Sequence, residues 1–192
     1  MKKQVIPSIS LFFACITFLS LNGCSKNKIS DHLNFSCKTN YKFTNLKACL
    51  EPNENYKINL PNNWKREFFV SKNESRLYYA DTTKELDKTY ISDIGLYFKK
   101  TNIDQDFLEN RISELKQDYG MQVIDSRNIV FQKKKGLLIY VSKETPVTNT
   151  IELYLQNKNK SFFLIKIDVY GNENQHERLC EALSIIEISE FY

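Results

Sequence analysis

Thiol and imidazole groups are the side chains with which this chain could do chemistry, and they are few. The 192 residues include five cysteines and two histidines. His176 and Cys180 are four residues apart and would share one stripe of a helix, where they could hold a metal ion or activate a thiol. Two ligands do not complete a zinc site, and no serine-histidine-aspartate or cysteine-histidine pair is recognisable. We therefore expect no metal, no cofactor and no enzymatic activity.

Two weaker motifs have simpler explanations. The segment Asp104-Gln105-Asp106 carries carboxylates suited to calcium. It lacks the glycine and the later glutamate of an EF-hand loop, so helix capping explains it better. Lysines gather in predicted turns, at positions 133 to 135 and at 158 and 160. A solvated turn is the ordinary interpretation of such lysines, and contact with an anionic lipid or glycan is the alternative.

The N-terminus has the three parts of an export signal. Lys2 and Lys3 provide the positive start, residues 11–21 form an apolar core, and Gly23 stands before a cysteine. The apolar core is too short to span a bilayer, which takes roughly 18 to 20 apolar residues. An ordinary cleaved signal peptide is the other alternative, so the residues around the cysteine decide between the two.

The tetrapeptide Leu-Asn-Gly-Cys at positions 21 to 24 resembles the lipobox of bacterial lipoproteins. The resemblance implies that Cys24 is linked to diacylglycerol, becomes the new N-terminus and carries a further acyl chain such as palmitate. Two or three chains anchor a protein durably. The protein is therefore expected to be held by lipid on a bacterial cell membrane, with its domain outside the cytoplasm. Ser25 resembles outer-membrane sorting, which favours the outer membrane over the inner one.

Three segments follow from this interpretation. They are a signal peptide over residues 1–23, a polar tether over residues 24–35 and one globular domain over residues 36–192. Loss of the signal peptide removes two lysines and lowers the formal net charge from +4 to about +2. This mild basic character gives no reason to expect a nucleic-acid partner. The many aromatic residues need an apolar interior, which excludes a disordered chain.

Three cysteines remain once Cys15 leaves with the signal and Cys24 takes the lipid. An oxidising envelope favours a bridge between Cys37 and Cys49, which would close a short loop before the first confident strand. Cys180 is predicted to be a packed free thiol on a helix. The alternative is that all three are small buried apolar residues.

Alternation at period two predicts a series of strands. A turn signal, Pro61-Asn62-Asn63, separates the first two, and Gly136 is expected to take the positive φ angle of a hairpin turn that starts at Lys133. The last long strand is almost continuously apolar, which indicates a central place in the sheet. The predicted strands cover residues 56–60, 64–70, 76–81, 91–98, 121–131, 137–141, 151–156 and 162–170.

Two segments have helical spacing instead. Residues 104–119 place apolar side chains on one stripe, with Asp104 as the N-cap and Gly120 at the end. A second helix is expected over residues 174–184, followed by an apolar run, residues 185–188, that could return to the sheet. Hairpins dominate the order of elements. We therefore expect a single α+β domain in which helices pack on an antiparallel sheet.

Three motifs lie at the boundaries of the predicted strands. They are Ile-Asn-Leu-Pro-Asn-Asn-Trp at 58–64, Tyr-Ala-Asp-Thr-Thr at 79–83 and Asp-Ile-Gly-Leu-Tyr-Phe at 93–98. Together they resemble the small secreted PsbP-like proteins over about residues 55 to 190. The resemblance implies an antiparallel sheet sandwiched between helices, and it carries over neither a photosystem role nor metal-binding residues. The richness in Asn and Lys is similar to that of lipoproteins from Flavobacterium-type bacteria.

Aromatic side chains are the remaining candidates for recognition. Trp64 follows a turn, where a tryptophan usually plugs the edge of a core, and ligand stacking is the alternative. Tyr78 and Tyr79 point to opposite faces of their strand, and one face should be left partly uncovered for a partner. We expect a noncatalytic accessory or docking module whose partner is another envelope protein. The alternative is a module that binds a small apolar or anionic ligand in a groove near Trp64.

Overall fold

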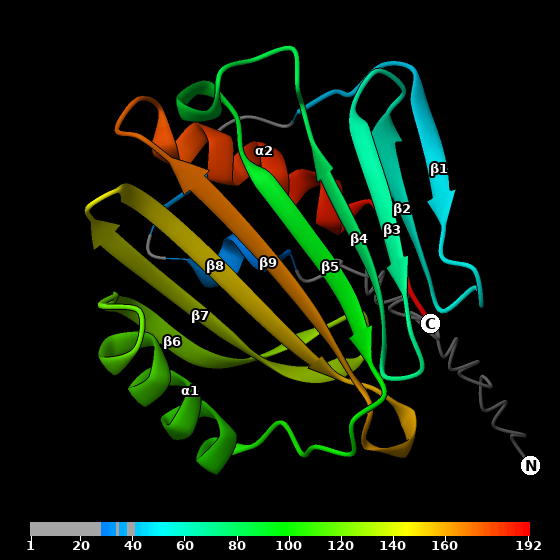
Figure 1. The fold of residues 1–192 in the computed structure, drawn as a ribbon, viewed down its shortest axis with the longest axis vertical. Coiled ribbons are helices and arrows are strands. Elements are labelled where there is room, and N and C mark those ends of the chain that lie inside the picture. Colours follow the sequence, from blue (N-terminus) through cyan, green and yellow to red (C-terminus); the bar gives the residue numbers. More distant parts are fainter. Residues whose placement is uncertain (1–27, 34, 38–40) are drawn as a thin grey trace, which may run out of the picture.

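Seven strands form one antiparallel sheet through the whole domain (Figure 1). The computed structural model describes residues 28–33, 35–37 and 41–192, so Cys24 and the predicted signal peptide lie outside the described residues. The order across the sheet is β3-β4-β5-β9-β8-β7-β6. Its members are β3 (Lys65–Val70), β4 (Glu74–Ala80), β5 (Ile91–Tyr97), β6 (Gln122–Phe131), β7 (Lys134–Glu144), β8 (Val147–Gln156) and β9 (Phe162–Tyr170).

A smaller antiparallel sheet stands beside the large one. It has the order β1-β2-β10, with β1 (Leu46–Leu50), β2 (Tyr56–Pro61) and β10 (Glu190–Phe191). The predicted turn at residues 61–63 therefore carries the chain from the small sheet to the large one, because β2 and β3 do not pair. Three short 3₁₀ helices, η1 (Ile29–His32), η2 (Leu86–Lys88) and η3 (Lys158–Lys160), complete the elements of the described residues.

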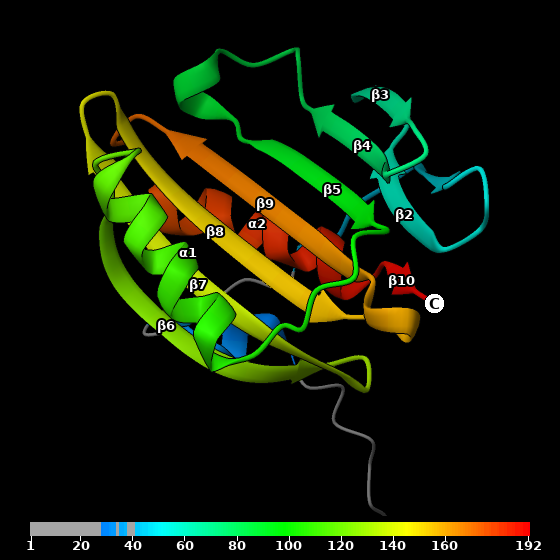
Figure 2. The same ribbon diagram turned by 60° about the horizontal axis from the view of Figure 1, so that its bottom comes forward.

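The two helices lie on opposite faces of the large sheet (Figures 1 and 2). Helix α1 (Gln105–Gln117) packs on one face of the sheet, which we call the outer face, over the half formed by β6, β7 and β8. Helix α2 (Gln175–Glu187) covers the opposite face, which we call the inner face. The expectation of a single α+β domain with an antiparallel sheet between helices is confirmed. The larger core lies between the inner face, α2 and the small sheet, and a second apolar cluster lies beneath α1.

Local signals place several elements as predicted. Strand β9 is the central strand, and its buried residues alternate along most of its length. Asp104 caps α1, since its Oδ1 accepts a hydrogen bond from the Phe107 amide at 3.1 Å. Gly120 has φ +61° just after the helix. The return of residues 185–188 to the sheet is wrong, because Ile185 and Ile186 are fully buried inside α2 and the chain re-forms a strand only at β10.

The turn between β6 and β7 also differs from its prediction. Gln132 and Lys133 have φ +47° and +65° and make the turn themselves. Gly136 lies inside β7, where an added Cβ would stand 2.0 Å from the carbonyl oxygen of Tyr154. Glycine is therefore needed there for the close approach of β8, and the turn takes its positive φ angles without it.

Candidate functional site

Half of the outer face of the large sheet has no helix over it. The apolar cluster beneath α1 reaches only Phe162 and Leu164 of β9 and Tyr97 of β5. The remaining outward side chains of β9, β5, β4 and β3 have no helix over them and are exposed or partly exposed, apart from Gly95 (Figure 2). The alternation along these strands puts aromatic and charged side chains side by side in the register of the sheet. We call this surface the open face; its residues are Glu67, Phe69, Arg76, Tyr78, Asp93, Lys166 and Asp168.

Arg76 is the centre of the open face. Its guanidinium donates to both carboxylate oxygens of Asp93, with Nε at 3.2 Å from Oδ1. It also lies over the Tyr78 ring, 4.8 Å from the centroid, and 5.9 Å from that of Tyr97. The hydrogen bond to Asp93 raises the pKa of Arg76, so the group stays charged. Its side chain is 25% exposed, which makes it a fixed but reachable cation.

The neighbouring strands continue this row of paired charges. Lys166 lies opposite Asp93 in the register, and its Nζ is 3.0 Å from Oδ2 of Asp168. The other oxygen of Asp168 accepts from Oγ1 of Thr150 at 2.6 Å. Towards α1 the carboxylate of Glu152 is fully buried and takes two hydrogen bonds from Arg111, at 2.8 and 2.6 Å. Each of these charged side chains is fixed by an ion pair or hydrogen bond to a neighbouring side chain, as is common in binding surfaces. The residues named in this row include no cysteine or histidine that could act as a nucleophile.

The three predicted recognition residues do not gather in one site. Trp64 is 6% exposed and lies in the core, with ring centroids 6.0 Å from Tyr79 and 5.5 Å from Tyr90. Tyr79 is buried on the inner face, and this burial raises the pKa of its hydroxyl. Tyr78 alone of the three lies on the open face. A hollow beside Tyr78 and Tyr79 measures about 130 Å³, well under the roughly 300 Å³ at which ligand pockets begin.

Replacement of Trp64 by alanine is expected to lower the free energy of unfolding by about 3 kcal/mol or more, because the change removes a buried ring from between two tyrosines. Tyr78→Ala is the matched control, with an expected loss of about 1 kcal/mol, since its main contact is a partly exposed cation-π pair. Urea unfolding measures both values. Equal losses in the two variants would contradict the buried position of Trp64.

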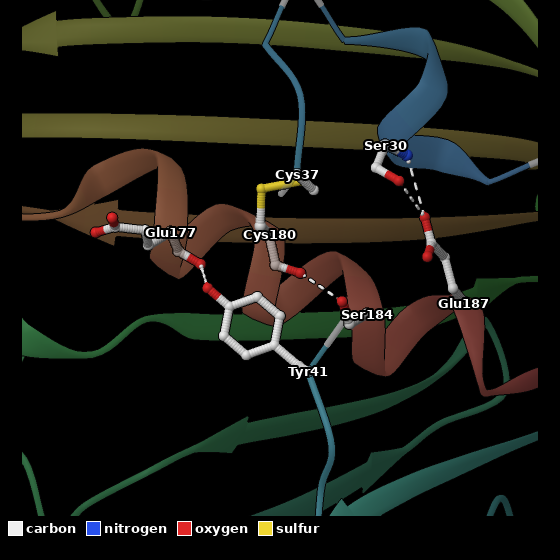
Figure 3. The surroundings of a disulfide bond; sticks show 7 residues. All are labelled: Ser30, Cys37, Tyr41, Glu177, Cys180, Ser184 and Glu187. Atoms are coloured by element: carbon white, nitrogen blue, oxygen red, sulfur yellow. Dashed lines mark hydrogen bonds between the residues drawn. A yellow bond between two sulfur atoms is a disulfide. The ribbon is translucent and has the colours of Figure 1, made fainter. Parts of the chain in front are cut away.

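A disulfide joins the N-terminal segment to α2 (Figure 3). The bond links Cys37 to Cys180. Next to it Phe35 stacks on His176 with centroids 4.4 Å apart, and the Tyr41 hydroxyl donates to the Glu177 carbonyl at 2.7 Å. We call the described residues from 29 to 43 the strap, because they run along α2 and cover its outward side.

The predicted bridge between Cys37 and Cys49 is wrong, and so is the prediction of a free thiol at Cys180. Cys49 is the free, buried cysteine of the described residues. It lies on β1, where Nη1 of Arg66 donates to its sulfur at 3.0 Å. The path of the strap explains why Cys37 pairs with Cys180 and not with Cys49. The strap places Cys37 beside α2, away from β1. The predicted tether over residues 24–35 is also too long, since Ile29 is already fully buried.

A second hollow lies at the N-terminal end of α2. It measures about 660 Å³ and is open to solvent. Burial raises the pKa of Glu181 in its wall. Arg178 anchors the floor with hydrogen bonds to main-chain carbonyls, including those of Thr89 at 2.8 Å and Tyr170 at 2.7 Å. We call it the acidic groove; its lining acids are Glu85, Asp87, Glu173, Glu177 and Glu181.

Two features are absent from the described part of the chain. It contains no group of three or more histidine, cysteine, aspartate or glutamate side chains placed to hold a metal ion. Over the same residues, no helix has the length and apolar character to cross a membrane.

Comparison with known proteins identifies the fold. No protein-family model and no curated protein sequence matches the chain. Cyanobacterial PsbP (CyanoP) from Synechocystis sp. PCC 6803 is similar in structure, with a TM-score of 0.51 and 11% identity over 83% of this chain and 99% of that one. A single-site variant of protein Mog1 has a TM-score of 0.51 and 9% identity over 77% of this chain and 96% of that one. The chain therefore has the fold shared by PsbP-like and Mog1 proteins.

Proposed function

We propose that the protein is a noncatalytic docking module, held by lipid at Cys24 on the outer membrane of a bacterial envelope. The lipobox resemblance supports the anchor. The Cys37–Cys180 disulfide supports a location outside the cytoplasm, because structural disulfides persist in oxidising compartments. The partner is another envelope protein.

The open face is the observation that carries the docking role. Arginine and tyrosine dominate the energetic centres of protein interfaces, and side chains that are already fixed lose little entropy on binding. Arg76 and Tyr78 meet both conditions, since Asp93 and the stacked ring hold the guanidinium in place. Phe69, at the edge of the same surface, is 51% exposed and adds an apolar contact. No comparable surface surrounds Trp64, so ligand binding there is not favoured.

Site-specific photo-crosslinking in cells tests the docking role. A benzophenone side chain at Tyr78 is expected to give a discrete adduct with one envelope protein, and Arg76→Ala should remove that adduct. Tyr119, which is 48% exposed at the far end of α1, is the matched control position and should give none. Equal adducts from both positions, or none from Tyr78, would count against the open face as the docking surface.

A further inference from the structure

One end of the large sheet is covered by lysines. The antiparallel order brings four connecting segments to the same end: the β3–β4 turn, the exit of β5, the β6–β7 turn and the β8–β9 connection (Figure 1). These segments, residues 71–73, 98–101, 132–135 and 157–161, contain no acidic residue. We call this end the lysine end; its lysines are Lys72, Lys99, Lys100, Lys133, Lys134, Lys135, Lys158 and Lys160.

Among the described residues, the lysines of the lysine end have no side-chain carboxylate as an ion-pair partner. The Nζ of Lys134 donates to the main-chain oxygen of Tyr192 at 3.1 Å. Lys134 is half-buried and donates to Oδ1 of Asn157 at 2.9 Å, and the other seven side chains are exposed. Burial and repulsion from Lys158 lower the pKa of Lys134. The nearby carboxylate of Glu190 is already taken by Lys57, at 2.6 Å.

The opposite end of the sheet has the opposite charge. Its connecting segments, residues 81–90, 118–121, 144–146 and 171–174, contain six acidic residues and two lysines. The acidic groove lies at this end. The domain is therefore polarised along its strands, and an anionic surface would attract the lysine end and repel the other.

The described chain also begins close to the lysine end. Ser30, in η1, donates to Oε1 of Glu187 at the end of α2, from its amide at 3.1 Å and from its hydroxyl at 2.9 Å. Two residues beyond Glu187, the carbonyl of Ser189 accepts from the side chain of Gln132 at 2.6 Å. Gln132 is the neighbour of Lys133 in the β6–β7 turn, and both ribbon views place the start of the described chain beside that turn.

We propose that the lysine end is a docking surface for the anionic phospholipid headgroups of the membrane that carries the anchor. The orientation rests on the proposed lipid at Cys24, since only residues 25–28 separate that cysteine from buried Ile29. These four residues span at most about 14 Å, which keeps the neighbouring β6–β7 turn of the lysine end close to the bilayer surface. The acidic groove then faces away from the membrane, and the open face stands between the two ends, where a partner can reach it.

Vesicle binding of the mature chain, residues 24–192 with Cys24→Ala, tests the surface apart from the anchor and from the apolar core of the signal peptide. The protein is expected to sediment with vesicles of phosphatidylcholine and phosphatidylglycerol, to bind pure phosphatidylcholine far less, and to be released by salt. Each lysine at an anionic surface strengthens binding by roughly fivefold, because it contributes about 1 kcal/mol. The combined variant Lys133→Gln, Lys135→Gln and Lys158→Gln should therefore bind about a hundredfold more weakly.

The matched control removes three exposed lysines away from the lysine end. The combination Lys47→Gln, Lys88→Gln and Lys116→Gln has the same net charge as the test variant and should bind within about twofold of the parent chain. Equal weakening of both variants would reduce the effect to net charge and overturn the proposal. Unchanged binding of the test variant, or equal binding to both kinds of vesicle, would also overturn it.

A second measurement needs no substitution in the lysine end. Acetylation of vesicle-bound protein should spare Lys133, Lys135 and Lys158, while Lys47 and Lys88 react as they do in free solution. Uniform reaction of all of them would overturn the docking surface. Both experiments use the chain without a lipid. A negative result would therefore contradict the docking surface without contradicting the lipid anchor. Conversely, evidence against the lipid anchor would not change the result of either experiment.

Discussion

Replacement of Cys24 by alanine is expected to abolish membrane anchoring and to leave the domain folded. The proposed acyl chains would supply the anchoring free energy, about 0.8 kcal/mol for each buried methylene, so we expect no partial effect. Lysines at an anionic surface bind reversibly and in a salt-dependent way, and they cannot replace a lipid. The measurement is incorporation of a radioactive fatty acid in growing cells, followed by separation of membranes at high salt.

Cys49→Ala is the matched control for this experiment. It removes a buried thiol that takes no part in the disulfide, so it should keep both the label and the membrane fraction. Thermal unfolding of the Cys24 variant should match that of the parent domain, because the described apolar core is built from Ile29 and residues after it. Equal fatty-acid incorporation into the Cys24 variant and the parent chain would refute the lipobox assignment.

Loss of the disulfide is expected to have the largest effect on stability. The bond joins residues that are 143 positions apart. Closure of so long a loop lowers the conformational entropy of the unfolded chain, which corresponds to about 5 kcal/mol in the free energy of unfolding. Measured values for native disulfides range from about 2 to 5 kcal/mol. The variant with Cys37→Ser and Cys180→Ser should therefore unfold at much lower urea than the oxidised parent.

Thiol mapping provides the check on this prediction. Alkylation of the unreduced, denatured mature protein should modify Cys49 and neither of the paired cysteines. Reduction should then release two more thiols and lower the urea midpoint to that of the double variant. Alkylation of Cys180 before reduction would contradict the pairing.

Elements with local signals could be predicted from the sequence, while the pairing of distant segments could not. Asp104 shows its role within one helical turn, and the apolar run of β9 indicates its central place in the sheet. The sequence contains no comparable local signal for the strap. Lys133 and Lys158 were recognised as turn lysines, but Lys72 joins them only through the strand order of the sheet.

One spacing relation could have revealed the disulfide. Phe35 and Cys37 are two positions apart, which is about 6.6 Å in an extended chain. His176 and Cys180 are four positions apart, which is about 6 Å along a helix. The ring stack and the disulfide satisfy both distances at once, so an extended segment lying along α2 fits this pair of spacings. The prediction paired Cys37 with Cys49 because an oxidising envelope favours a bridge and the helical pattern around Cys180 indicates a packed thiol.

The strap also determines how a pull on the anchor would act on the domain. Ser30 contacts Glu187 at the C-terminal end of α2, and Cys37 is bonded to Cys180 nearer the N-terminal end. A force on the N-terminus would first separate the strap from the C-terminal end of α2. The separation would stop at Cys37, because the disulfide joins this residue covalently to Cys180. The leash would lengthen from four residues to twelve, or from at most about 14 Å to at most about 43 Å. An oxidised protein anchored in this way would thus have two defined reaches from its membrane, and beyond the second α2 would bear the load.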